Sequence, residues 1–176
     1  MRDAEKTVAG IIDKCKTALI GSIDRDGFPN TKAILAPRER EGIEVLWFTT
    51  NTSSMRAAQY RENPKACVYF FDPRFFRGVM LRGTMEVLED AASKERIWRD
   101  GDTMYYPGGV TDPDYCVLRF TTSDGRYYSN FKSENFACGR IGRSEPKMPE
   151  VTRSPSRCAT LVFRAVYRVS SVRSTT

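Results

Sequence analysis

The sequence predicts one mainly β domain, an antiparallel barrel with helices at its periphery. About seven short segments have the alternating or continuously apolar pattern of strands, and turn residues join several of them into hairpins. Three short segments have the apolar spacing of helices, and no long alternation of strands with helices predicts a parallel sheet. At 176 residues, the chain is long enough for one such barrel and too short for a large second domain.

The N-terminal part predicts a helix followed by a hairpin. Residues 3–16 carry apolar side chains at helical spacing, and Glu5 lies in the first turn, where the helix dipole favours a negative charge. Residues 18–23 have a strand pattern. Residues 24–27 are typical of a hairpin turn, so the returning strand is expected over 29–36.

The next segments predict a strand, a short helix and a second strand. The first strand is expected over 43–50, where aromatic residues suit a half-buried sheet. Residues 51–54 are good helix N-caps, and the Asn-Pro pair at 63–64 ends the helix that follows. Residues 66–71 form an apolar strand pattern.

A long strand is expected over 77–89, with Gly83 as the site of a bend or bulge. Asp90 is a suitable cap for a helix over 91–98. A loop rich in Pro and Gly follows at 105–113.

Two final strands complete the expected barrel, which spans residues 1–136. They are predicted over 115–121 and 126–131, with a turn at 123–125. The remaining residues, 137–176, are expected to be a separate extension.

Charge and composition set this extension apart. Residues 1–136 contain 20 Lys and Arg against 20 Asp and Glu, whereas residues 137–176 contain eight basic and two acidic residues. Residues 138–158 are rich in Pro, Ser and Arg and read as linker or disorder, while 159–172 would add one strand or helix. An arm for nucleic acid or an anionic surface is the alternative, but only Phe163 and Tyr167 could stack on bases, so nucleic acid is disfavoured.

Composition excludes several function classes. The chain has no His, which excludes Ser-His-Asp catalysis, His-ligated zinc and a haem on a proximal His. Its five cysteines are at least 20 positions apart, without a CxxC pair, and are expected to be reduced thiols with no metal bound. No apolar run is long enough for a membrane helix and the N-terminus is polar, so a cytosolic protein is expected.

The candidate site lies where the strand over 43–50 gives way to a helix. Thr49 and Thr50 end the strand, Ser54 is an N-cap candidate, and Arg56 follows in the first helical turn. Free N–H groups, hydroxyls and a guanidinium at a helix N-terminus can hold a phosphate, and Lys32 on the neighbouring hairpin would add a second cation. The alternative is an ordinary capped helix with a solvated arginine.

Several segments together resemble the pyridoxamine 5′-phosphate oxidase-like superfamily. The first set is Gly27-Phe28-Pro29 with Lys32, residues 47–51, Ser54-x-Arg56, residues 62–66 and residues 77–87. A second set is more similar to the general stress protein branch: Trp98, residues 106–109, Asp112-Pro113-x-Tyr115 and Tyr127-Tyr128. The resemblance covers about residues 3–136, in order and with few gaps.

The resemblance implies an FMN-binding split barrel that works as a homodimer with two flavins in the subunit interface. It places Lys32 at a basic phosphate ligand of the family, and Ser54 and Arg56 at its Ser-x-Lys/Arg phosphate ligands. It places Thr49 and Thr50 at strand-end groups that meet the flavin ring or ribityl chain.

Three departures argue against a true pyridoxamine phosphate oxidase. Met55 stands at a position that is often basic in those oxidases, and Gly78 stands where they have a glutamine that contacts the flavin. Their final segment with Arg and His residues that grip the substrate has no counterpart in residues 137–176.

Two aromatic residues, Trp98 and Tyr106, are further cofactor-binding candidates. Large aromatic side chains near a flavin can stack on its ring or wall its pocket. Packing in the core or in a dimer interface is the alternative for both.

The sequence therefore predicts an FMN-dependent oxidoreductase whose flavin transfers hydride or electrons, with no catalytic side chain identified. The first alternative is a flavin-binding stress protein without turnover. A related barrel that uses the deazaflavin F420 is a second, and a nucleic-acid-associated protein that acts through its basic tail is a third. Haem is disfavoured for want of His, although Cys or Tyr ligation stays open.

Overall fold

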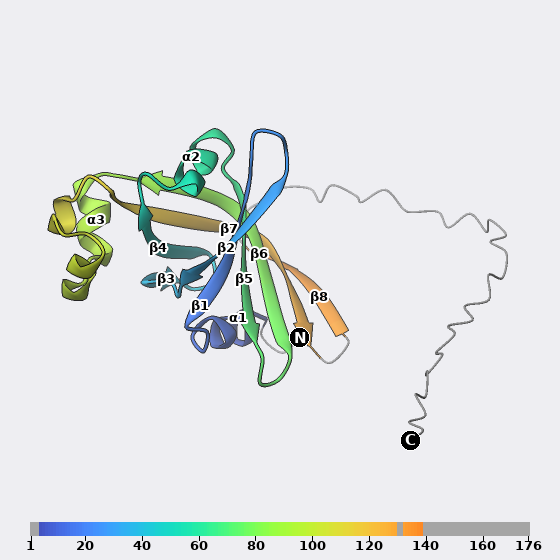
Figure 1. Ribbon diagram of the computed structural model, residues 1–176. Helices are drawn as coiled ribbons and strands as arrows, with labels where there is room; N and C mark the ends of the chain where they lie inside the picture. The colour runs from blue at the N-terminus through green and yellow to red at the C-terminus, as the bar shows by residue number, and fades with distance from the viewer. Residues whose placement is uncertain (1–3, 130–131, 139–176) are drawn as a thin grey trace, which may run out of the picture. The chain divides into compact units, whose positions relative to one another are not determined.

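Eight antiparallel strands form one sheet in the computed structural model, which describes residues 4–129 and 132–138 (Figure 1). The sheet order is β2-β1-β5-β6-β7-β4-β3, and β8 pairs with β7. The strands are β1 (Thr17–Ile23), β2 (Pro29–Leu35), β3 (Glu39–Glu41), β4 (Val45–Asn51), β5 (Lys65–Asp72), β6 (Arg77–Leu88), β7 (Tyr115–Ser129) and β8 (Lys132–Ala137). The described helices are α1 (Ala4–Ile12), α2 (Met55–Glu62), α3 (Ala91–Ile97) and the 3-10 turns η1 (Asp100–Met104) and η2 (Gly109–Thr111).

The long strand β7 organises the sheet. Along one edge it pairs with β6 over almost its whole length. Its other edge is divided, because β4 pairs with the first half of β7 and β8 with the second half. The sheet therefore divides instead of closing into a complete cylinder, and the prediction of a mainly β antiparallel fold with peripheral helices is confirmed.

A bulge at Gly83 allows β6 and β7 to stay in contact. The register of the pair shifts between Arg82 and Gly83, as the glycine in this strand predicts. A Cβ atom at Gly83 would lie 1.9 Å from the carbonyl oxygen of Thr121. The backbones thus approach more closely than any side chain allows.

The predicted hairpin at residues 123–125 is wrong, because β7 continues through them as one strand. Asp124 does not form a turn but accepts a 2.7 Å hydrogen bond from Nε of Arg82 on β6. Gly125 has the ring of Phe136 against it, with Cζ of Phe136 2.4 Å from where a Cβ would be. Here Asp124 forms an ion pair with Arg82, and Gly125 leaves space for the ring of Phe136.

Three other elements differ from the prediction, and one of them is β8, which lies beyond the last expected strand. Helix α1 ends at Ile12, four residues earlier than the apolar spacing suggests. The short strand β3 was not predicted, because its Glu-Arg-Glu sequence has no apolar pattern. Arg96 on α3 donates hydrogen bonds to Glu39 and Glu41 and so holds β3 from outside the sheet.

Two apolar clusters stabilise the described fold. The larger cluster lies inside the sheet and beneath α1 and α2; its largest members include Tyr60, Phe48, Phe70, Phe120 and Ile11. The smaller cluster lies under α3 and consists of Trp47, Ile97, Tyr106, Tyr115 and Val117. Because side chains alternate along β4, Trp47 belongs to one cluster and Phe48 to the other.

The predicted extension falls almost entirely outside the described residues. Strand β8 includes Ala137, and Cys138 is the last residue that the structure describes. The four described cysteines, Cys15, Cys67, Cys116 and Cys138, are free thiols.

Candidate functional site

The junction between β4 and α2 brings together several buried polar side chains, Thr50, Arg56 and Gln59. Strand β4 pairs with β7 as far as Asn51, opposite Tyr115, and α2 begins at Met55 after a short turn. Ser54 is the N-cap, as predicted, and its Oγ accepts a 3.2 Å hydrogen bond from the backbone N–H of Ala57. The other first-turn N–H groups point out of the helix N-terminus, where they favour an anion.

Asp114, just before β7, fixes this turn from the neighbouring strand. Its carboxylate accepts hydrogen bonds from Nδ2 of Asn51 at 2.7 Å and from the backbone N–H of Ser53 at 2.8 Å. These bonds lower the pKa of Asp114 below its ordinary value of 3.8. The sequence analysis did not identify this residue, because the contact spans more than 60 positions and no local pattern announces it.

Arg56 is buried here without a carboxylate. Only 8% of its surface is exposed, and the one hydrogen bond that its side chain forms with described residues runs from Nη2 to Oγ1 of Thr50 at 3.4 Å. Its Nε and Nη1 atoms have no partner among the residues that the structure describes. By contrast, Arg38, also largely buried, forms an ion pair with Asp102.

A buried guanidinium with two unpaired nitrogen atoms is costly unless an anion satisfies their N–H groups. Burial lowers the pKa of Arg56, which reflects the same loss of solvation, although the group stays charged at neutral pH. The cluster of Thr50, Ser54 and Arg56 can therefore accept an anionic group such as a phosphate.

Helix α2 is held firmly against β1, which fixes the position of Arg56. Oη of Tyr60 donates a 3.2 Å hydrogen bond to the carbonyl oxygen of Gly21. Oγ of Ser22 donates a 2.6 Å hydrogen bond to Oε1 of Gln59. Burial raises the pKa of Tyr60 well above its ordinary value, so its hydroxyl stays protonated.

Lys32 lies on the hairpin beside this helix. It is the cross-strand partner of Ile20 on β1, and partners in an antiparallel pair share a face. Ser22, two residues further along β1, is on that face and contacts α2. The Lys32 side chain is exposed and forms no ion pair with any described residue.

The two threonines at the end of β4 point to opposite sides of the sheet. Thr50 is buried and faces Arg56, whereas Thr49 is half-buried and pairs with Val117 of β7. The structure thus groups Thr50, Ser54 and Arg56 and leaves Thr49 on the other face.

Trp98 and Tyr106 lie in the smaller core cluster. The ring of Tyr115 is 5.2 Å from Trp98 and 4.8 Å from Tyr106, measured between centroids. Tyr106 is buried, which raises the pKa of its phenol. Core packing accounts for these contacts, and none of them involves Thr50, Ser54 or Arg56.

Gly78 is covered by a neighbouring side chain. A Cβ at Gly78 would lie 2.2 Å from the hydroxyl oxygen of Tyr69 on β5. A longer residue at this position would therefore displace the tyrosine.

Acid should weaken the turn that Asp114 holds. A carboxylate with a lowered pKa in the folded state stabilises the protein above its unfolded pKa, and that contribution disappears as the pH falls through the folded value. Asp114→Asn should therefore lower the unfolding temperature at neutral pH, and the difference from wild type should close once the pH falls below the lowered folded-state pKa of Asp114. Thermal unfolding monitored by circular dichroism measures this; a difference that persisted in acid would contradict it. Asp26→Asn, in the exposed turn after β1, is the control.

No helix among the described residues is long and apolar enough to cross a membrane. Over the same residues, no three His, Cys, Asp or Glu side chains are placed to hold a metal ion.

Comparison with known proteins gives the family. The sequence model described as pyridoxamine 5′-phosphate oxidase matches residues 4–129. The chain belongs to this family. The family resemblance of the sequence is thus confirmed.

Solved structures of the pyridoxamine 5′-phosphate oxidase family confirm the split-barrel fold. A Clostridium acetobutylicum protein related to general stress protein 26 of B. subtilis has 37% identity and a TM-score of 0.72, over 78% of this chain and 96% of its own. General stress protein 26 from Bacillus anthracis has 17% identity and a TM-score of 0.64, over 77% and 99%. A pyridoxamine 5′-phosphate oxidase-related, FMN binding protein from Nostoc punctiforme has 14% identity and a TM-score of 0.55, over 77% and 96%.

Similarity to curated oxidases is partial. A pyridoxine/pyridoxamine 5′-phosphate oxidase from Christiangramia forsetii is 26% identical over 84 residues, which are 48% of this chain and 38% of that enzyme. A relative from Legionella pneumophila is 28% identical over 75 residues, or 34% of its length. The chain thus aligns with well under half of the length of each of these relatives.

Proposed function

We propose that this protein binds FMN non-covalently and acts as a cytosolic flavin-dependent oxidoreductase. The observation that carries the proposal is the buried guanidinium of Arg56, whose Nε and Nη1 have no partner among the described residues. A phosphate monoester supplies the negative charge and the acceptor oxygens that these two N–H groups lack. Family membership and an FMN binding relative support the same ligand.

The residues at the β4–α2 junction would hold the phosphate. Arg56 would donate from Nε and Nη1, while Ser54 and the first-turn N–H groups of α2 would face the phosphate from the helix end. Lys32 would contribute a second cation from the β1–β2 hairpin. Thr50, on the face of β4 that Arg56 occupies, would meet the ring or the ribityl chain, whereas Thr49, on the other face, would reach the flavin only at the end of the strand.

The bound flavin would supply hydride or electron transfer, which the chain's own side chains do not provide. The protein would orient the flavin through its phosphate and limit solvent access on the side that α2 and β1 close. Tyr60, protonated behind Arg56, contributes no negative charge that would compete with the phosphate for the guanidinium.

A homodimer with the flavins at the subunit interface completes the proposal, as the family resemblance implies. Trp98 and Tyr106 would border the flavin only through the edges that do not pack on Tyr115. The barrel over 1–136 would hold the flavin, with 137–176 as a separate extension.

Vitamin B6 oxidation is not the activity that we propose. Binding a pyridine phosphate in these oxidases uses a histidine, and the chain has none. The ring of Tyr69 occupies the space beside Gly78 in which the glutamine side chain of the oxidases would have to fit.

Reduction of the bound flavin distinguishes an oxidoreductase from a flavin-binding protein without turnover. The second function is favoured because, among the described residues, no general acid or base forms a hydrogen bond with Arg56, whose side chain contacts only the Thr50 hydroxyl in this way. With the FMN-loaded protein under anaerobic conditions, we expect NADH or NADPH to bleach the visible flavin band and an added acceptor to restore it. A band unchanged by both nucleotides would favour the non-catalytic function.

Lys32→Ala should weaken FMN binding without abolishing it. The side chain is exposed, so its charge acts through solvent and should contribute roughly a five- to tenfold difference in Kd. Titration of FMN fluorescence quenching measures the Kd at low salt. Lys65→Ala, an exposed lysine at the start of β5, is the matched control and should leave the Kd unchanged. Equal Kd values for Lys32→Ala and wild type would remove Lys32 from the site.

A further inference from the structure

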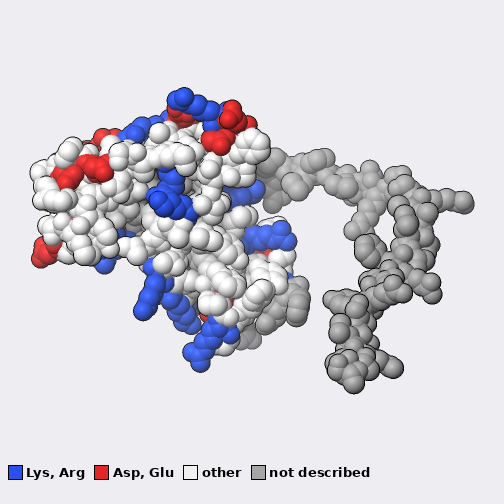
Figure 2. Space-filling view, viewed as in Figure 1, with Lys and Arg blue, Asp and Glu red and all other residues white. Residues whose placement is uncertain are grey.

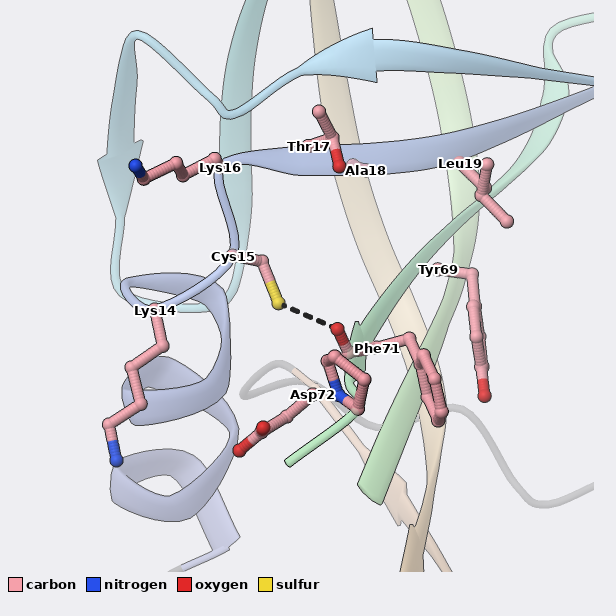
Figure 3. Close-up of a pocket in the computed structure, with 10 residues that line it drawn as sticks. Lys14, Cys15, Lys16, Thr17, Ala18, Leu19, Tyr69, Phe71 and Asp72 are labelled. Atoms are coloured by element: carbon pink, nitrogen blue, oxygen red, sulfur yellow. Dashed lines mark hydrogen bonds between the residues drawn. The ribbon is translucent and has the colours of Figure 1, made fainter. Parts of the chain in front are cut away.

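A cavity of about 420 Å³ lies at the opposite end of β1 from the candidate phosphate site (Figure 3). It opens between the turn after α1, the first residues of β1 and the end of β5. Strand β1 begins at this cavity, at Thr17, and reaches α2 only at Gly21 and Ser22. Figure 1 shows α1 and α2 at different ends of the sheet. The volume is in the usual range of small-molecule pockets.

The cavity has an apolar end. Leu19, Tyr69 and Phe71 lie together there, and Leu19 and Phe71 are 42% and 38% exposed although both are sheet residues. The rings of Tyr69 and Phe71 are stacked at 6.5 Å. The Tyr69 hydroxyl has no hydrogen-bond partner in the described part of the chain. This end therefore offers aromatic and aliphatic surface with one free hydroxyl donor.

The other end is cationic. Figure 3 shows Lys14 and Lys16 at the side of the cavity away from Leu19 and Tyr69. Neither lysine forms an ion pair with a residue that the structure describes. On the face seen in Figure 2, basic side chains gather at this lower end of the fold, where Figure 1 has α1. Lys16 directly precedes β1 and is three positions from Leu19, which corresponds to roughly 10 Å of extended chain.

Other titratable groups of the cavity cancel this charge only in part, because the charge of Asp72 acts on Lys14 but is engaged mainly by Arg77. Asp72 accepts a 2.7 Å hydrogen bond from Nη2 of Arg77 and another from the backbone N–H of Arg74 at 3.1 Å, so most of its charge is already compensated. The Cys15 thiol donates to the carbonyl oxygen of Phe71 at 3.4 Å. Burial raises its pKa, so it stays neutral.

We propose that this cavity binds a small organic carboxylate with an aromatic body. The carboxylate lies at the Lys14 and Lys16 end, and the ring lies against Leu19, Tyr69 and Phe71. The cationic end lies at the opposite end of β1 from Arg56, and the proposal rests on the lining of the cavity, not on flavin binding.

The test uses the full chain and two probes of the same shape, 2-naphthoate and the uncharged 2-naphthylmethanol, titrated by isothermal calorimetry. We expect naphthoate to bind more tightly than the alcohol. The double variant Lys14→Gln and Lys16→Gln should weaken naphthoate roughly five- to tenfold and leave the alcohol unchanged. Leu19→Ser should weaken both probes, and Lys65→Gln should weaken neither.

A second measurement locates the probe without any substitution. Naphthoate should slow alkylation of Cys15, which lines the cavity, and leave that of Cys138 unchanged. Two results would overturn the proposal: naphthoate binding that the lysine changes do not affect, or binding that leaves Cys15 unprotected. Absence of naphthoate binding would overturn it as well.

Discussion

Arg56→Met should abolish tight FMN binding and, in the same protein, raise the unfolding temperature of the flavin-free form. The wild-type guanidinium is 8% exposed and lacks a carboxylate, so in the absence of a ligand it costs stability. Methionine keeps much of the side-chain length and removes the charge. Loss of several charge-assisted hydrogen bonds from the guanidinium to the phosphate should raise the Kd of FMN about 100-fold or more.

Opposite changes in ligand affinity and stability distinguish a binding residue from a structural one. Differential scanning fluorimetry without flavin gives the unfolding temperature, and fluorescence quenching gives the Kd. Arg61→Met, an exposed arginine on the same helix that pairs with Glu89, should change both values little. Arg56→Lys should retain part of the affinity. A destabilised Arg56→Met protein that still binds FMN tightly would show that the guanidinium supports the fold instead.

Gly83→Ala should destabilise the protein by about 2–4 kcal/mol, a large part of the usual stability of a domain. A Cβ at this position would lie 1.9 Å from the carbonyl oxygen of Thr121 and 2.8 Å from its carbonyl carbon. Both contacts are with the backbone of β7, which cannot move away without breaking the β6–β7 ladder. Chemical denaturation should show the loss as a lower midpoint with a similar slope.

Gly10→Ala is the matched control for this substitution. Gly10 lies within α1 and has no atom within 4 Å of an added Cβ. Alanine there should stabilise the helix by up to about 1 kcal/mol. Similar denaturation midpoints for the two variants would contradict a bulge that requires glycine.

Interactions between residues that are close in sequence explain which features could be predicted. Ser54 caps α2 as the run of N-cap residues indicates, because capping depends on neighbours within one turn. Gly83 marks the bulge for a similar reason, since a bulge is one of the usual roles of a glycine within a strand. Apart from β3, strand and helix positions up to α3 follow from periodicity and differ mainly at their ends.

Long-range packing explains what was not predictable. The burial of Arg56 depends on its tertiary surroundings, and the sequence of its own short helix does not predict it. Asp114 reaches the loop after β4 only because β7 pairs with β4. Asp124 and Gly125 have the composition of a turn, yet an ion pair to Arg82 and contact with Phe136 keep them in a strand.

The central claim is that Arg56 and its neighbours hold the phosphate of FMN, and a comparison of FMN with riboflavin on the wild-type protein tests it most directly. The purified chain is incubated with each flavin, desalted, and its visible absorption spectrum recorded. We predict that FMN is retained with the protein and released as FMN on denaturation, whereas riboflavin, which lacks the phosphate, is lost. Equal retention of the two flavins, or a colourless protein with both, would contradict the claim.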